Sequence, residues 1–157
     1  RWAWQQDAGS AIRCCNGSSI RPAMTPSEAF AAICLAAVGC DGQLGREEAK
    51  LLRSQLEFRQ PFASSSEDSM ATLFDQLLAV LRNEGWSELV RRAVPQLNPD
   101  QRETVLALAA HLVRVDRLVQ PAEEAFLSEL SVALALPDGR AAQILDVIAI
   151  LHRDCLA

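Results

Sequence analysis

Glycine, proline and aromatic residues are scarce in this chain of 157 residues, which has seven glycines, seven prolines and no tyrosine. These low counts exclude collagen-like and low-complexity chains, and an apolar share of 50% excludes an intrinsically disordered one. A chain of this length buries enough surface to fold without disulfide bonds or a structural metal. We therefore expect a soluble globular domain whose composition does not reveal a function.

An excess of positive charge is also missing. The sequence has 15 Lys and Arg against 20 Asp and Glu, a net charge of -5, and its only adjacent basic residues are Arg91 and Arg92. Proteins that bind nucleic acids or anionic membranes through phosphate groups rely on clustered positive charge. We therefore expect neither a nucleic-acid partner nor a polybasic membrane patch.

Long apolar runs and paired cysteines are absent as well. The longest uncharged apolar run covers residues 29–40, about half the length needed to cross a bilayer. The cysteines are odd in number and show no C-x-x-C spacing: Cys14, Cys15, Cys34, Cys40 and Cys155. This usage is typical of a reducing compartment, so the sequence predicts a cytoplasmic protein.

The common catalytic motifs do not occur. The sequence has no glycine-rich phosphate loop, no G-x-S-x-G and no H-E-x-x-H. Its two histidines, His111 and His152, lie in apolar helical patterns, and His152 with Cys155 offers two ligands where a structural zinc site needs four. We interpret them as boundary histidines beside a C-terminal thiol, and we predict that the protein is not an enzyme.

Helical patterns are what the sequence does contain. Thr25-Pro26-Ser27-Glu28 has the residues of a capping box with proline at the first helical position. No segment shows the period-two alternation of a strand. The patterns predict seven helices, at about 26–39, 45–57, 67–83, 87–94, 98–115, 121–134 and 138–154, the fourth capped by Ser87 and the seventh by Asp138.

Residues 1–23 show neither a helical nor a strand period. Met24 stands directly before the first helix-start signal, so we interpret residues 1–23 as a poorly structured N-terminal extension: a tag, an upstream reading or a flexible arm. The predicted domain is 24–157.

The helical region contains an internal repeat. A shift of 75 residues places residues 30–52 on 105–127, with five identical positions: Ala32 on Ala107, Val38 on Val113, Asp41 on Asp116, Glu48 on Glu123 and Leu52 on Leu127. Each copy reads as a helix, an acidic turn and a second helix with acids in its first turn.

This arrangement resembles the tellurite-resistance TerB-like family, in which an alanine-rich helix runs into an Asp-Gly turn followed by a glutamate-rich helix start. Here the motif is residues 40–48, CDGQLGREE, and the second copy, 115–124, has Arg117 in place of the turn glycine. The resemblance implies a single compact all-α domain of seven helices in two pseudo-symmetric halves. It also implies a cytoplasmic protein connected with tellurite and stress resistance and with assemblies at the inner membrane.

The acids of the two turns are the candidate site. The resemblance implies that they bind a cation, and convergence of the two copies would offer carboxylate oxygens to Ca²⁺ or Mg²⁺. The candidate ligands are Asp41, Glu47, Glu48, Asp116, Glu123 and Glu124. The alternative interpretation is structural: the aspartates hold the turns and the glutamates complement the helix dipoles.

The sequence and the resemblance together predict a non-enzymatic binding module, and the resemblance implies that it takes a divalent cation through acidic turns and acts through a protein partner at the inner membrane surface. The alternative is a small helical homo-oligomeric scaffold whose acids are purely structural.

Overall fold

The computed structural model describes residues 24–42, 44–115 and 119–155, and in these ranges every regular element is helical. The seven α-helices are α1 (Pro26–Val38), α2 (Arg46–Leu56), α3 (Glu67–Glu84), α4 (Trp86–Ala93), α5 (Pro99–Val113), α6 (Pro121–Leu134) and α7 (Arg140–Leu151). Short 3-10 turns, η1 (Phe62–Ser64) and η2 (Val94–Gln96), follow α2 and α4. The predicted all-α fold of seven helices is confirmed, while the predicted extension 1–23 lies outside the described residues.

Two of the helices begin at matching capping boxes, one in each half of the repeat. The Thr25 side chain accepts a hydrogen bond from the Glu28 backbone, and Asn98 does the same for Gln101. In both cases the third helical residue returns a bond to the cap backbone, which satisfies two free N–H groups at the helix start. The two helices of each copy form as predicted, whereas residues 116–118 of the second turn lie outside the described residues.

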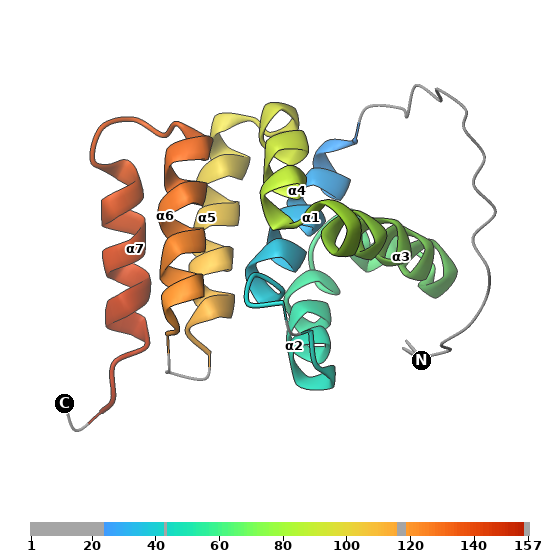
Figure 1. Ribbon diagram of the computed structural model, residues 1–157, viewed down its shortest axis with the longest axis horizontal. Helices are drawn as coiled ribbons and strands as arrows, with labels where there is room; N and C mark the ends of the chain where they lie inside the picture. Colours follow the sequence, from blue (N-terminus) through green and yellow to red (C-terminus); the bar gives the residue numbers. More distant parts are fainter. Residues whose placement is uncertain (1–23, 43, 116–118, 156–157) are drawn as a thin grey trace.

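The first helix, α1, is the centre of the fold. Every residue from Ala29 to Val38 except Phe30 is buried, so this helix is covered on all sides. It packs against α4 and α5, and also against α2 and α3 (Figure 1). Its many alanines explain this position, because small side chains leave room for neighbouring helices at close range.

The second half of the molecule consists of α5, α6 and α7, in which α5 packs against both of the other helices (Figure 1). The described helix α7 contains no buried residue, although Ile144, Leu145 and Ile148 are partly buried against the core. Near its start, Arg140 makes a bidentate ion pair with Glu103 of α5, at 2.8 and 2.7 Å. The outermost helix is therefore attached by a narrow apolar strip and by polar contacts.

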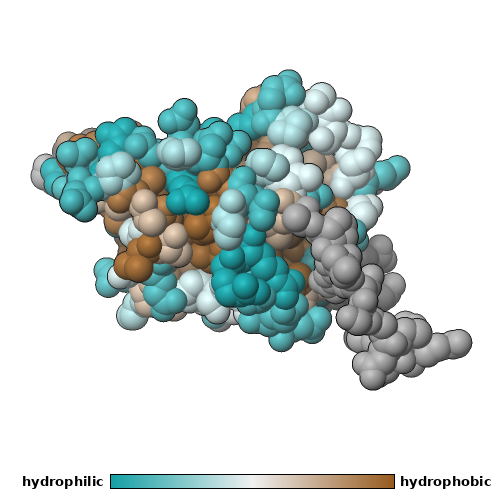
Figure 2. Space-filling model, turned by 90° about the horizontal axis from the view of Figure 1, so that it is seen from above, coloured by the Kyte–Doolittle hydropathy of each residue, from teal (hydrophilic) through white to brown (hydrophobic). Residues whose placement is uncertain are grey.

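Hydrophobic surface lies on this same side of the molecule. Figure 2 shows it over the part formed by α5, α6 and α7. Val147, Ile150 and Leu151 of α7 are 63%, 55% and 68% exposed, and Val132 of α6 is 79% exposed. These four residues form the exposed apolar surface of α6 and α7.

Beside the packing of α1 on α5, two side-chain contacts connect the halves. The Trp86 ring at the start of α4 packs edge-to-face with Phe126 of α6, with ring centroids 5.1 Å apart. Arg102 of α5 donates hydrogen bonds to the carbonyls of Leu97, Leu134 and Val94, at 3.1, 3.1 and 3.3 Å. It thereby holds the end of α6 against the turn that follows α4.

The structure corrects two predicted helix starts. Ser87 does not cap α4, because the helix begins one residue earlier, at Trp86. The preceding Gly85 has φ +85°, a backbone conformation that only glycine adopts easily. Asp138 does not cap α7, whose N-cap is Gly139 at φ +77°. The fifth and seventh helices also end earlier than predicted, at Val113 and Leu151, because the predicted ends ignored the tightening of the last turn.

None of the described helices is both long and apolar enough to cross a membrane. The described cysteines, Cys34, Cys40 and Cys155, are free thiols, whereas Cys14 and Cys15 lie outside the described residues. Burial raises the pKa of Cys34, in the middle of α1, to about 12, so this side chain behaves as a small hydrophobe.

Candidate functional site

The first acidic turn follows directly from the way α1 ends. Gly39 is the C-cap of the helix, and the N–H of Gly42 donates to the Gly39 carbonyl at 3.1 Å. Gly42 has φ +81°, a backbone conformation that other residues rarely adopt. This tight turn leaves Asp41 exposed and keeps Cys40 half-buried against the core.

The Cys40 thiol is influenced by its own helix and by two acids. It donates to the Ala37 carbonyl at 3.3 Å. Burial and the negative charges of Glu123 and Asp41 together raise the pKa of Cys40 to about 11. Asp41 belongs to the first copy of the repeat and Glu123 to the second, so acids of both copies act electrostatically on the same thiol.

Glu123 is held in place by the start of α6. Its carboxylate accepts a hydrogen bond from the Gln120 backbone at 2.7 Å, as the third residue of a capping box. The side chain is half-buried, while Glu124 beside it is exposed. A carboxylate oxygen at this position has a fixed orientation, because the cap and the helix together limit its rotamers.

The two acids at the start of α2 have local partners. Glu47 accepts a bond from Lys50 at 2.8 Å, and this bond and the Lys50 charge lower the pKa of Glu47. The carboxylate of Glu48 folds back over Gly45, the N-cap of its helix, where a β-carbon would meet it. Both contacts fit the structural interpretation of these glutamates.

Of the six predicted ligands, Asp41 and Glu123 therefore act on one thiol through their charges, and Glu47 and Glu48 have local contacts. Glu124 is exposed on the first turn of α6, and Asp116 lies outside the described residues. The described residues contain no group of three or more His, Cys, Asp or Glu that could hold a metal ion. The described part of the site thus offers two carboxylates, which are ligands suited to a hard cation.

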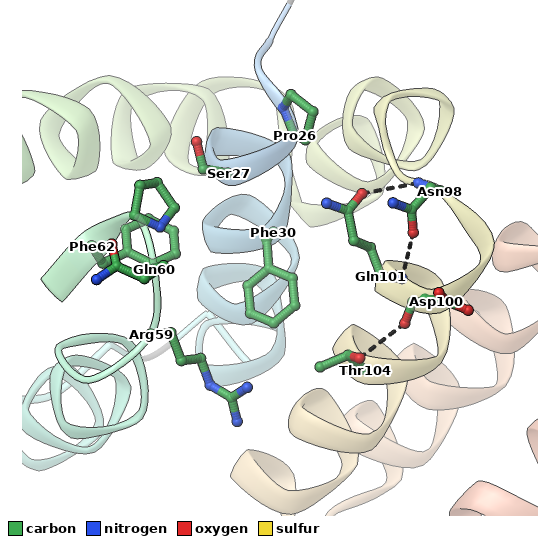
Figure 3. Close-up of a pocket in the computed structure, with 11 residues that line it drawn as sticks. Pro26, Ser27, Phe30, Arg59, Gln60, Phe62, Asn98, Asp100, Gln101 and Thr104 are labelled. Atoms are coloured by element: carbon green, nitrogen blue, oxygen red, sulfur yellow. Dashed lines mark hydrogen bonds between the residues drawn. The ribbon is translucent and has the colours of Figure 1, made fainter. Parts of the chain in front are cut away.

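Sequence reasoning missed a groove at the opposite end of α1. It has a volume of about 480 Å³, and its lining includes Phe30, Arg59 and the first turns of α1 and α5 (Figure 3). The Arg59 guanidinium lies over the Phe30 ring, 6.0 Å from its centroid. The loop from Arg59 to Phe62 thus both closes the bundle, through buried Phe62, and forms one wall of the groove.

The polar groups of the α5 wall bind one another rather than pointing freely into the groove. Asn98 and Gln101 exchange hydrogen bonds of 3.0 and 2.8 Å, and the Thr104 hydroxyl donates to the Asp100 carbonyl at 2.9 Å. Figure 3 shows these bonds along the wall. This wall does not present a nucleophile and a base in contact, which is the arrangement that covalent catalysis requires.

A second feature that the sequence did not predict is a histidine pair. Nδ1 of His111 lies 2.9 Å from Nε2 of His152, and the ring planes meet at 47°. The interpretation of both as boundary residues is correct in that each is half-buried. Their contact joins residues 41 positions apart, and no local pattern in the sequence indicates it.

Comparison with known proteins agrees with this architecture. A family model described as tellurite resistance protein TerB matches residues 27–146, from the first turn of α1 into α7. Searches of curated proteins and of solved structures gave no match. The matched span includes both helix-turn-helix copies and both acidic turns. The chain therefore belongs to the TerB family of tellurite resistance proteins.

Proposed function

We propose that this TerB-family protein is a non-enzymatic, cytoplasmic binding module. It takes a divalent cation, Ca²⁺ or Mg²⁺, at its acidic turns and acts through a protein partner, at the inner membrane surface. The observation that supports the proposal is electrostatic: Asp41 and Glu123 come from different halves of the repeat, and both raise the pKa of the same Cys40 thiol.

Electrostatics gives the reason why a cation would bind there. The charges of Asp41 and Glu123 both act on the half-buried Cys40 thiol, and a divalent cation between the turns would offset the repulsion between these like charges. Because α1 and α6 belong to different copies of the repeat, such an ion would also tie the two halves together. The bound ion is then a means of setting the shape that the partner recognises.

A thermal-shift titration tests the cation part of the proposal. Ca²⁺ or Mg²⁺ should raise the melting temperature of the wild type, by a gain equivalent to about 2.7 kcal/mol at a hundredfold excess over the dissociation constant. Asp41→Asn, Asp116→Asn and Glu123→Gln should each remove the gain. Glutamine at 123 can still accept the Gln120 hydrogen bond, so this variant removes the charge and preserves the helix cap.

Asp75→Asn is the matched control, because Asp75 is an exposed acid on α3. It should leave the cation response unchanged. A melting temperature that responds to neither ion would reject the cation part, and an equal response in the wild type and the Asp41 and Glu123 variants would reject the site.

The exposed apolar surface of α6 and α7 favours one second candidate, a homo-oligomeric scaffold whose acids are structural. In that case Val147 and Ile150, each more than half exposed, would be covered by a second copy. Sedimentation velocity separates the two candidates. A dimer that Ile150→Asp dissociates would support the scaffold, and a monomer at high micromolar concentration would reject it.

A further inference from the structure

The strongest feature outside the acidic turns is the histidine pair at the bottom of the α5 and α7 contact. His111 lies in the last turn of α5, and His152 is the C-cap of α7. The facing nitrogens are 2.9 Å apart and the ring centroids 4.9 Å apart. In this arrangement one ring donates its N–H to the lone pair of the other.

The spacing of these nitrogens matches that of two ligands on one metal ion. Two imidazole nitrogens bound at about 2.0–2.1 Å lie about 2.9 Å apart when they subtend about 90° at the ion, and about 3.3 Å apart at the tetrahedral angle. The observed 2.9 Å corresponds to the right-angled geometry. Because the facing nitrogens are hydrogen-bonded and point towards each other, both rings must turn before their lone pairs converge on an ion. Square-planar and octahedral ions such as Cu²⁺ and Ni²⁺ keep this nitrogen separation, whereas tetrahedral Zn²⁺ also requires the rings to separate.

The surroundings also favour a cation. Both histidines lie at the C-terminal ends of helices, where the carbonyl groups carry partial negative charge. Arg114, the nearest described basic residue along α5, donates to the carbonyl of Ala110 on its own helix. Both imidazoles are half-buried, so an ion from solvent can reach them while the side chains stay ordered.

We propose that His111 and His152 form a two-histidine site for a divalent transition-metal ion, with water completing the coordination. The ion takes the place of the shared proton. That proton moves to the outer nitrogen of the donor ring, so that both facing nitrogens present lone pairs. Affinity should follow the order Cu²⁺ above Ni²⁺, with Zn²⁺ weaker than its place in the series because of the geometry.

Such an ion would stabilise the packing of α7, the helix that is least buried. The described helix α7 has no buried residue, and the Glu103 to Arg140 ion pair fixes only its start. A metal bridge between His111 and His152 would fix its other end to α5. The site is chemically distinct from the acidic turns, because nitrogen ligands select transition metals and carboxylates select Ca²⁺ and Mg²⁺.

The test uses the full chain without a histidine tag, and NiCl₂ as the probe. Isothermal titration should give one Ni²⁺ per chain, and Ni²⁺ should raise the melting temperature. His111→Gln and His152→Gln should each weaken Ni²⁺ binding at least about tenfold, since even residues that only support a metal ligand cost about 10- to 100-fold when changed. Asp41→Asn should bind Ni²⁺ as the wild type does.

Nuclear magnetic resonance of the wild type gives a second readout that does not depend on how the variants fold. The chain has only two histidines, so its imidazole ring-proton signals come from this pair alone. Substoichiometric Ni²⁺ should broaden both sets of signals, and Mg²⁺ should broaden neither. Unbroadened imidazole signals would overturn the proposal. So would wild-type affinity in both glutamine variants, or binding that Cys155→Ser abolishes and His111→Gln leaves intact.

Discussion

Phe126 offers the sharpest test of how the two halves are joined. This side chain of α6 is fully buried. The Trp86 ring of α4 packs edge-to-face with it, with ring centroids 5.1 Å apart. Phe126→Ala removes the ring and leaves a cavity that the surrounding helices fill only in part. Phe58 is the matched control, since the same residue type is 84% exposed there.

The expected magnitude follows from this burial. Replacing a buried phenylalanine with alanine costs about 3–5 kcal/mol, which includes the lost transfer free energy and the cavity. Of this, about 0.5–1.5 kcal/mol should depend on Trp86, as the specific energy of an edge-to-face pair. In a protein of this size the total corresponds to a fall in melting temperature of about 6–20 °C. Phe58→Ala should stay within about 0.5 kcal/mol of the wild type.

Urea unfolding followed by the far-ultraviolet circular dichroism of the helices measures both values. The double variant of Phe126→Ala with Trp86→Ala completes a cycle that isolates the pair energy. If Phe126→Ala cost no more than Phe58→Ala, the packing of α6 on α4 described here would be refuted. A coupling energy of zero would refute only the specific ring contact.

Three further predictions concern polar and backbone features. Hydrogen bonds from Arg91 and Arg92 lower the pKa of Glu88 to about 2. The stabilisation is therefore complete above the unfolded pKa and is lost as the pH falls towards 2, so the wild type and Glu88→Gln should differ in melting temperature at pH 6 and converge in acid. Arg102→Gln should lower the free energy of unfolding by about 1.5–3 kcal/mol, because three carbonyls lose a charged donor, and urea unfolding beside exposed-site controls measures this. Ala135 has φ +47°, so Ala135→Gly should raise the free energy of unfolding by up to about 1 kcal/mol; a loss in calorimetry would contradict the assigned strain.

The features that the sequence predicted well depend on residues close together along the chain. The capping box at Thr25 requires groups only three positions apart and formed as predicted, and the predicted helix start at Asn98 has a capping box as well. The start of α6 at Pro121 was also correct, since proline fits the first helical position. The prediction that Ser87 caps α4 was wrong because the turn at Gly85 starts the helix one residue earlier. A hydrophobic pattern does not indicate a positive φ at glycine.

In the candidate site, too, contacts between residues close in sequence were predictable, and contacts between distant residues were not. Contacts of Glu47 with Lys50 and of Glu48 with Gly45 lie within one helical turn, and the structural interpretation anticipated such roles. The electrostatic influence of Glu123 on Cys40 depends on how α6 packs beside α1, which the repeat suggested and only the fold supplies. The contact between His111 and His152 depends on the docking of α7, for which the repeat has no counterpart.

The shallow burial of α7 has a consequence for how the protein opens. A helix with no buried residue can separate from its neighbours at a small cost in free energy, whereas α1, covered on all sides, cannot be exposed without the collapse of the core. The amide protons of α7 should therefore exchange with solvent through a local opening, and those of α1 only through global unfolding. The chain thus has two levels of stability: α1 opens only on global unfolding, whereas α7 opens locally.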